Sequence, residues 1–185
     1  QDKIKILERK TATIFNFTLE LSAMSNKDLS IVLLQSDIFW EDAGKNLAHF
    51  SSMINNIPPA DLVVLPEMFS TGFTVNTEKC AETMDGPSMQ FLKEIAGAKN
   101  CLVVGSLLIR EEPGFYNRLV CMFPDGTCQT YDKRHLFRLS EEYKVMQGGN
   151  RKIIVQKDDW HFLPLVCYDL RFPVWSKNTY HNGNH

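Results

Sequence analysis

Apolar and β-branched residues gather in short runs that predict strands. The early runs have few polar interruptions, as expected for strands buried on both faces. Two later runs flank the strong turn sequence at residues 124–127 and predict a hairpin. The predicted strands are residues 29–38, 61–65, 101–109, 117–123, 128–132, 152–156 and 162–166.

Two other segments carry apolar residues at helical spacing. In residues 41–56 the apolar positions recur every three or four residues, so one face packs inward, and Pro58 and Pro59 end the helix. Pro87 opens a second helix, over residues 87–99, because proline suits the first helical position, where its missing N–H is not needed.

The order of these elements predicts the fold class. Strands alternate with helices early and then give way to hairpins, which indicates an α/β protein with a mixed sheet and helices packed on one face. We expect one domain over residues 24–185. Residues 1–23 precede Met24, the first methionine, and we expect them to form an extension outside the domain.

Composition excludes several classes of function. The formal net charge is -2 and no basic stripe occurs, so we expect no nucleic-acid partner. No apolar run approaches the length of a membrane span, so we expect no membrane partner. The five cysteines form neither a C-x-x-C pair nor a zinc spacing, so we expect no metal and reduced thiols in the cytoplasm.

Three reactive side chains follow predicted strands. Glu67 comes after Leu-Val-Val-Leu-Pro, Lys133 after the second hairpin strand, and Cys167 after Phe-Leu-Pro-Leu-Val. Singly, each has an ordinary reading, as a surface carboxylate, a charged turn and a small buried thiol. Together they form a working set, since a carboxylate can deprotonate a thiol and a cation can stabilise an oxyanion. A Cys–His pair with His135 or His161 is the rival arrangement.

The three segments together resemble the nitrilase superfamily of carbon–nitrogen hydrolases. The matching sequences are Leu-Pro-Glu-Met-Phe around Glu67, Tyr-Asp-Lys-Arg-His-Leu-Phe around Lys133 and Val-Cys-Tyr-Asp-Leu-Arg-Phe-Pro around Cys167. The resemblance implies a Glu-Lys-Cys triad. It also implies a second glutamate that orients the lysine and assists proton transfer, which we match to Glu142, although Glu141 is its neighbour.

Within that superfamily the sequence is most similar to the omega-amidases. This implies hydrolysis of the terminal amide of 2-oxoglutaramate or 2-oxosuccinamate through a Cys thioester, without a metal or organic cofactor. The alternatives are another amidase, an N-carbamoyl hydrolase or a nitrilase of the same superfamily, or an inactive binding or assembly module.

The resemblance also implies an α-β-β-α sandwich, assembled as a homodimer, and family members continue beyond this chain's end, so we expect a C-terminally incomplete domain. Several side chains are candidates for the substrate pocket. Arg171 is a candidate for binding a substrate carboxylate, with an ion pair to Asp169 as the structural alternative. For the aromatic candidates the alternative is the core; these are Phe69, Phe73, Tyr116 and Tyr168.

Overall fold

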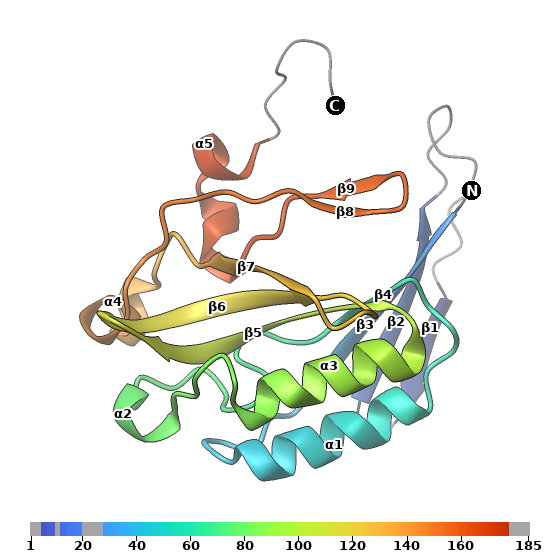
Figure 1. Cartoon of the computed structure of the whole chain (residues 1–185), viewed down its shortest axis with the longest axis horizontal. Helices are drawn as coiled ribbons and strands as arrows, with labels where there is room; N and C mark the ends of the chain where they lie inside the picture. Colours follow the sequence, from blue (N-terminus) through green and yellow to red (C-terminus); the bar gives the residue numbers. More distant parts are fainter. Residues whose placement is uncertain (1–4, 10–11, 20–27, 178–185) are drawn as a thin grey trace.

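The computed structural model describes residues 5–9, 12–19 and 28–177. Seven strands form one sheet whose spatial order follows the chain (Figure 1). The two central pairings, β3–β4 and β4–β5, are parallel, and the others are antiparallel. The strands are β1 Lys5–Arg9, β2 Ala12–Leu19, β3 Leu29–Ser36, β4 Leu62–Val64, β5 Leu102–Glu111, β6 Gly114–Met122 and β7 Cys128–Asp132.

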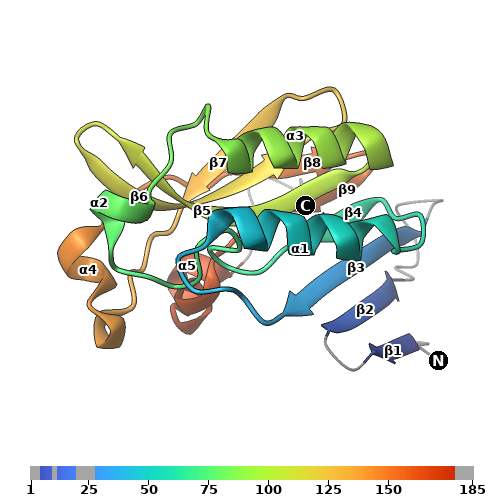
Figure 2. The ribbon, with the colours of Figure 1, turned by 90° about the horizontal axis from the view of Figure 1, so that it is seen from below.

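Two long helices cover one face of this sheet. Helices α1 (Ala43–Asn55) and α3 (Pro87–Lys99) lie side by side against it (Figure 2). The side chain of Asp42 caps α1 by accepting a hydrogen bond from the Lys45 N–H at 3.0 Å. Pro87 opens α3, and Asn100 ends it in the left-handed conformation with a φ of 50°.

Apolar side chains fill both faces of the sheet. The larger cluster lies between the sheet and the two helices, around the fully buried Val32, Phe50 and Phe69. A second cluster lies on the opposite face, beneath the hairpin of β8 (Val155–Lys157) and β9 (Trp160–Phe162) (Figure 1). Helices, large sheet and small sheet therefore form three successive layers of the expected sandwich.

Five short elements complete the described part of the chain. Three of them, η1, α4 and η2, belong to the segments that follow β7 and carry candidate site residues. The five are α2 Thr77–Cys80, the 3-10 turn η1 Arg138–Ser140, α4 Glu142–Val145, the 3-10 turn η2 Cys167–Arg171 and α5 Pro173–Ser176.

Most predicted elements are confirmed, but one strand is wrong. Residues 163–166 pair with no strand, because Pro164 has no N–H to give to a ladder and no described strand lies beside them. Cys167 therefore follows an irregular segment. The predicted strand at 152–156 is displaced to Val155–Lys157.

The N-terminal strands extend the large sheet. Strand β2 pairs antiparallel with β3, and β1 pairs with β2. The expectation that residues 1–23 lie outside the domain stays a prediction, and residues 178–185 lie outside the described part. No helix in the described residues is long and apolar enough to cross a bilayer.

The sheet topology explains how distant residues meet. Strand β7 runs antiparallel to β6, which runs antiparallel to β5, so β7 points the same way as β4 and β5. The carboxyl ends of β4 and β7, and the start of β6, therefore share one edge of the sheet. Side chains that follow β4 and β7 converge at that edge.

Candidate active site

Glu67 lies in a turn directly after β4 that is fixed by β5. The next residue, Met68, has a φ of 47°, which few non-glycine residues adopt. Its N–H donates to the Ser106 hydroxyl at 2.9 Å, and the Phe69 N–H donates to the Ser106 carbonyl at 3.3 Å. Phe69 itself is fully buried in the core. It anchors the turn and does not line the site.

Lys133 is fully buried and is held by two carboxylates. Its ammonium donates to Glu67 Oε1 at 2.7 Å and to Glu142 at 3.0 and 3.2 Å. Burial is the largest single influence on the pKa of Lys133 and would lower it, but the two carboxylates together outweigh burial and raise the pKa above its ordinary value. Lys133 therefore stays protonated and supplies a fixed cation.

Glu142, not its neighbour Glu141, contacts the lysine. Glu142 is fully buried and also accepts the Phe137 N–H at 2.6 Å. Glu141 is exposed, has a φ of 65° and pairs with Lys144 at the surface. The position of α4 after this left-handed residue turns Glu142 inward.

Asn117 was not among the candidates from the sequence. It lies near the start of β6, fully buried, and its side-chain nitrogen donates to Glu67 Oε1 at 2.8 Å and to Glu142 Oε1 at 3.0 Å. In the sequence it is one polar residue in a strand, and only the pairing of β6 with its neighbours brings it to the carboxylates.

Cys167 begins the turn η2 and is exposed. Its φ is 42°, so the backbone turns sharply at the thiol. Partial desolvation is the largest cause that raises the pKa of Cys167. The Glu67 carboxylate raises it further, also by a side-chain hydrogen bond, and Lys133 opposes the rise. The thiol is therefore protonated at rest and lies against a carboxylate that can accept its proton.

A buried carboxylate ties the Cys167 turn to the segment that carries Lys133. Asp169 is fully buried and accepts four hydrogen bonds. The donors are the His135 N–H at 2.9 Å, the His135 ring at 2.8 Å, the Tyr131 hydroxyl at 2.7 Å and the Val166 N–H at 3.1 Å. Since these donors flank both Lys133 and Cys167, Asp169 fixes the lysine and the thiol relative to each other.

The histidines have other roles than partners of the thiol. His135 binds Asp169 and stacks on Phe172 with ring centroids 3.7 Å apart. His161 is exposed on β9. His135 is thus held by Asp169, and His161 lies on the β8–β9 hairpin, whereas the charges that act on Cys167 are those of Glu67, Lys133 and Glu142. This arrangement favours the Glu–Lys set over the Cys–His rival.

Aromatic side chains border the cluster. The Lys133 ammonium lies 5.0 Å from the centroid of the Phe73 ring, a cation–π distance. Phe73 also meets Phe137, which in turn meets Tyr168 edge-on at 5.2 Å. Phe73 and Tyr168 are only partly buried, so the structure brings these two candidates to the border of the site.

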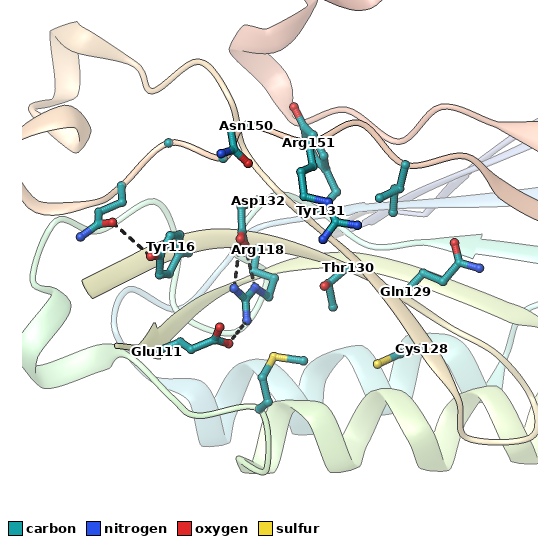
Figure 3. Close-up of a pocket in the computed structure, with 15 residues that line it drawn as sticks. Glu111, Tyr116, Arg118, Cys128, Gln129, Thr130, Tyr131, Asp132, Asn150 and Arg151 are labelled. Atoms are coloured by element: carbon teal, nitrogen blue, oxygen red, sulfur yellow. Dashed lines mark hydrogen bonds and ion pairs between the residues drawn. The ribbon is translucent and has the colours of Figure 1, made fainter. Parts of the chain in front are cut away.

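Tyr116 lies on the other face of β6. Successive strand residues point to opposite faces, so with Asn117 turned to the carboxylates Tyr116 turns away from them. It lines a separate, largely polar cavity of about 920 Å³, shown in Figure 3. There its hydroxyl donates to Gln147, and Arg118 pairs with Glu111 and Asp132. The structure does not bring Tyr116 to the cluster.

Arg171 is exposed at the end of η2. The described residues include no ion pair between it and Asp169, whose partners are Tyr131, His135 and Val166. The guanidinium therefore remains available to an external carboxylate.

Comparisons with known proteins agree with this geometry. The family model described as carbon-nitrogen hydrolase matches residues 30–183. The omega-amidase YafV of Escherichia coli (strain K12) is 42% identical over 150 residues, which are 81% of this chain and 58% of that protein. The 2-oxoglutaramate amidase of Bacillus subtilis (strain 168) is 32% identical over 161 residues, covering 84% of this chain and 62% of that protein.

Solved structures share the fold. A CN-hydrolase superfamily protein from Xanthomonas campestris, XC1258, superposes with a TM-score of 0.78 at 39% identity, over 80% of this chain and 56% of that one. Nit3 of Saccharomyces cerevisiae superposes with a TM-score of 0.73 at 24% identity, over 84% of this chain and 61% of that one. The predicted nitrilase-like α/β fold is confirmed. The chain spans about three fifths of the length of these relatives.

Proposed function

We propose that this chain, which belongs to the carbon–nitrogen hydrolase family, hydrolyses the terminal amide of a small 2-oxo dicarboxylic acid monoamide. One observation carries the proposal: the buried Lys133 ammonium is bound by Glu67 and Glu142, and the Glu67 and Lys133 charges both act on the exposed Cys167 thiol. Similarity to an omega-amidase and a 2-oxoglutaramate amidase supports the substrate class.

In the first half of the reaction, Cys167 is acylated. Glu67 accepts the thiol proton as Sγ attacks the amide carbon, and the carbonyl oxygen becomes an oxyanion. Lys133 stabilises this charge, together with the backbone N–H of Tyr168 at the start of η2. When the C–N bond breaks, protonated Glu67 returns its proton to the leaving nitrogen, which departs as ammonia.

In the second half, water hydrolyses the thioester. Glu67 accepts a proton from the water as its oxygen attacks the acyl carbon, and the C–S bond then breaks. The 2-oxo acid is released, and the thiol regains its proton. Glu142 takes no proton in this scheme and orients Lys133. The scheme needs no metal or organic cofactor.

Two exposed cysteines provide a matched test. Cys167→Ala is expected to abolish ammonia release from 2-oxoglutaramate, because the nucleophile is lost. Cys128→Ala removes the other exposed thiol and is expected to leave the rate unchanged. Retained hydrolysis in the Cys167→Ala variant contradicts the mechanism.

The substrate class is tested by comparing three compounds. We expect 2-oxoglutaramate to be hydrolysed with a higher kcat/KM than an N-carbamoyl amino acid or an aliphatic nitrile. Arg171 is proposed to bind the far carboxylate of the substrate in a bidentate fork, so Arg171→Met is expected to raise KM mainly. Preference for another compound assigns the chain to another branch of the family, and activity on none favours a binding module.

We also propose that the protein acts as a homodimer in a reducing compartment such as the cytoplasm. A reducing compartment keeps the nucleophile as a thiol, and none of the five cysteines forms a disulfide. Sedimentation at micromolar concentration tests the dimer.

A further inference from the structure

Asn117 closes a ring of four side chains at the sheet edge. Its single amide nitrogen carries two hydrogens, and it donates to Glu67 Oε1 and to Glu142 Oε1. Lys133 donates to both glutamates as well. Lys133 and Asn117 therefore each donate to both carboxylates, and Glu142 accepts in addition the Phe137 N–H.

The environment of the Asn117 side-chain oxygen also shows that the hydrogen bonds to Glu67 and Glu142 determine how the amide is oriented. Asn117 Oδ1 is buried and has no hydrogen-bond partner within the described residues. An unpaired buried carbonyl is costly to stability. Rotating the amide by half a turn gives no relief, because Oδ1 would then face two carboxylate oxygens. The two carboxylates therefore fix the orientation of the amide.

Charge in the ring explains the need for a neutral donor. Two carboxylates share one ammonium, so the cluster carries an excess negative charge in a buried place. The charged groups that face Asn117 are Glu67, Lys133 and Glu142. Without the amide, the two carboxylates repel each other across the lysine, and Glu67 turns more freely away from the thiol.

We propose that Asn117 is a positioning residue that fixes the Glu67 and Glu142 carboxylates against Lys133 and so holds Glu67 against the Cys167 thiol. It touches neither the thiol nor the reacting atoms of a substrate, and it acts through the glutamates. The inference rests on the proposed amidase mechanism for its effect on turnover.

The experiment replaces Asn117 by Ser and by Asp in the full chain. Two quantities are measured: kcat and KM for 2-oxoglutaramate, and the pH midpoint for alkylation of Cys167 by iodoacetamide, followed on the peptide that contains Cys167. Asn46→Asp is the matched control. Asn46 is also a fully buried asparagine that donates twice from its amide nitrogen, but to the carbonyls of Phe39 and Ser70.

The two substitutions are expected to move the midpoint in opposite directions. In Asn117→Ser, Glu67 is released and raises the pKa of the thiol less, so the midpoint falls by about half a pH unit or more. In Asn117→Asp, a further negative charge raises the midpoint by a similar amount. Both variants lower kcat at least about tenfold. KM changes less than about threefold, because the side chain at position 117 does not contact the substrate. Asn46→Asp leaves the midpoint unchanged.

A folded Asn117→Ser variant with the wild-type midpoint and the wild-type kcat overturns the proposal, even if its melting temperature falls. If Asn117→Asp does not fold, the neutral Ser variant decides alone. Failure of the proposed function looks different: the wild-type chain then hydrolyses none of the amides, and Asn117 is judged by the alkylation midpoints, which need no substrate.

Discussion

At the scale of single residues, the Glu67 carboxylate has two opposite effects on the Cys167 thiol. The Glu67 charge raises the pKa of Cys167, which makes the resting thiol less reactive, yet the same carboxylate is the base that the proposed reaction needs. The two effects separate in a variant that keeps the shape of the side chain and removes its charge.

Glu67→Gln is expected to abolish amide hydrolysis while lowering the pH midpoint of Cys167 alkylation. Removing the negative charge removes a cause that raises the pKa of the thiol, so more thiolate exists at neutral pH. The midpoint is measured as a pH profile of iodoacetamide labelling, with Glu78→Gln, an exposed glutamate, as control. A midpoint that rises in Glu67→Gln would contradict this account of the thiol.

The sequence was sufficient to identify candidate site residues that are ionisable or nucleophilic and lie in a recognisable motif. Glu67, Lys133 and Glu142 meet in the structure, and the charges of all three act on Cys167. Asn117 could not be identified this way, because an asparagine in a strand is chemically ordinary. Its importance depends on which residues the neighbouring strands bring within 3.0 Å of its nitrogen.

At the scale of elements, the site depends on contacts between the end of strand β7 and the short elements η2 and α5. The turn η2 is joined to the Lys133 segment by Asp169, and the Trp175 ring after it donates to the Tyr131 hydroxyl at 2.9 Å. Sequence periodicity recovered α3 and β7 with their observed bounds, because helices and hairpins have local signals. It failed at residues 163–166, an apolar run that is only partly buried and has no partner strand among the described residues.

Asp169→Asn is expected to lower the free energy of unfolding by about 3 kcal/mol. The substitution replaces one carboxylate oxygen by an NH2 group, which then faces two hydrogen-bond donors. Hydrogen bonds to a charged acceptor contribute about 1.5–3 kcal/mol each. Urea denaturation at pH 7 measures the loss. Asp42→Asn, at the exposed cap of α1, is the control and should change stability little, since asparagine caps equally well. An equal loss in both variants would show that the Asp169 contacts do not stabilise this region.

At the scale of the whole molecule, the core and the site share residues. Phe50 on α1, Phe69 after the Glu67 turn and Phe91 on α3 form a chain of ring contacts, with centroids 5.8 and 6.0 Å apart. The general architecture, a mixed sheet with helices on one face, followed from the sequence. The position of Phe69 did not, since an aromatic residue beside a reactive glutamate fits either pocket or core.

Phe50→Ala is expected to destabilise the protein by about 3–5 kcal/mol, because it leaves a cavity in a fully buried cluster. It should also lower kcat in the molecules that remain folded, since Phe69 loses support beneath the Glu67 turn. Thermal unfolding and turnover are measured together, with Phe39→Ala, a half-exposed ring, as control. Unchanged kcat in the folded fraction would show that the turn keeps its shape without the ring.

The ion pair between Arg118 and Asp132 has a consequence for how the chain avoids misalignment. Asp132 is the last residue of β7 and lies opposite Arg118, on the face that Lys133 does not use. If β7 slid by one residue during folding, Asp132 would exchange faces with Lys133. Three carboxylates would then meet without a cation, and Arg118 would lose one of its two carboxylate partners. A shift of β7 by one residue is therefore unfavourable on both faces of the sheet. Lys133, besides its role in the site, thus favours the correct register of β7 during folding.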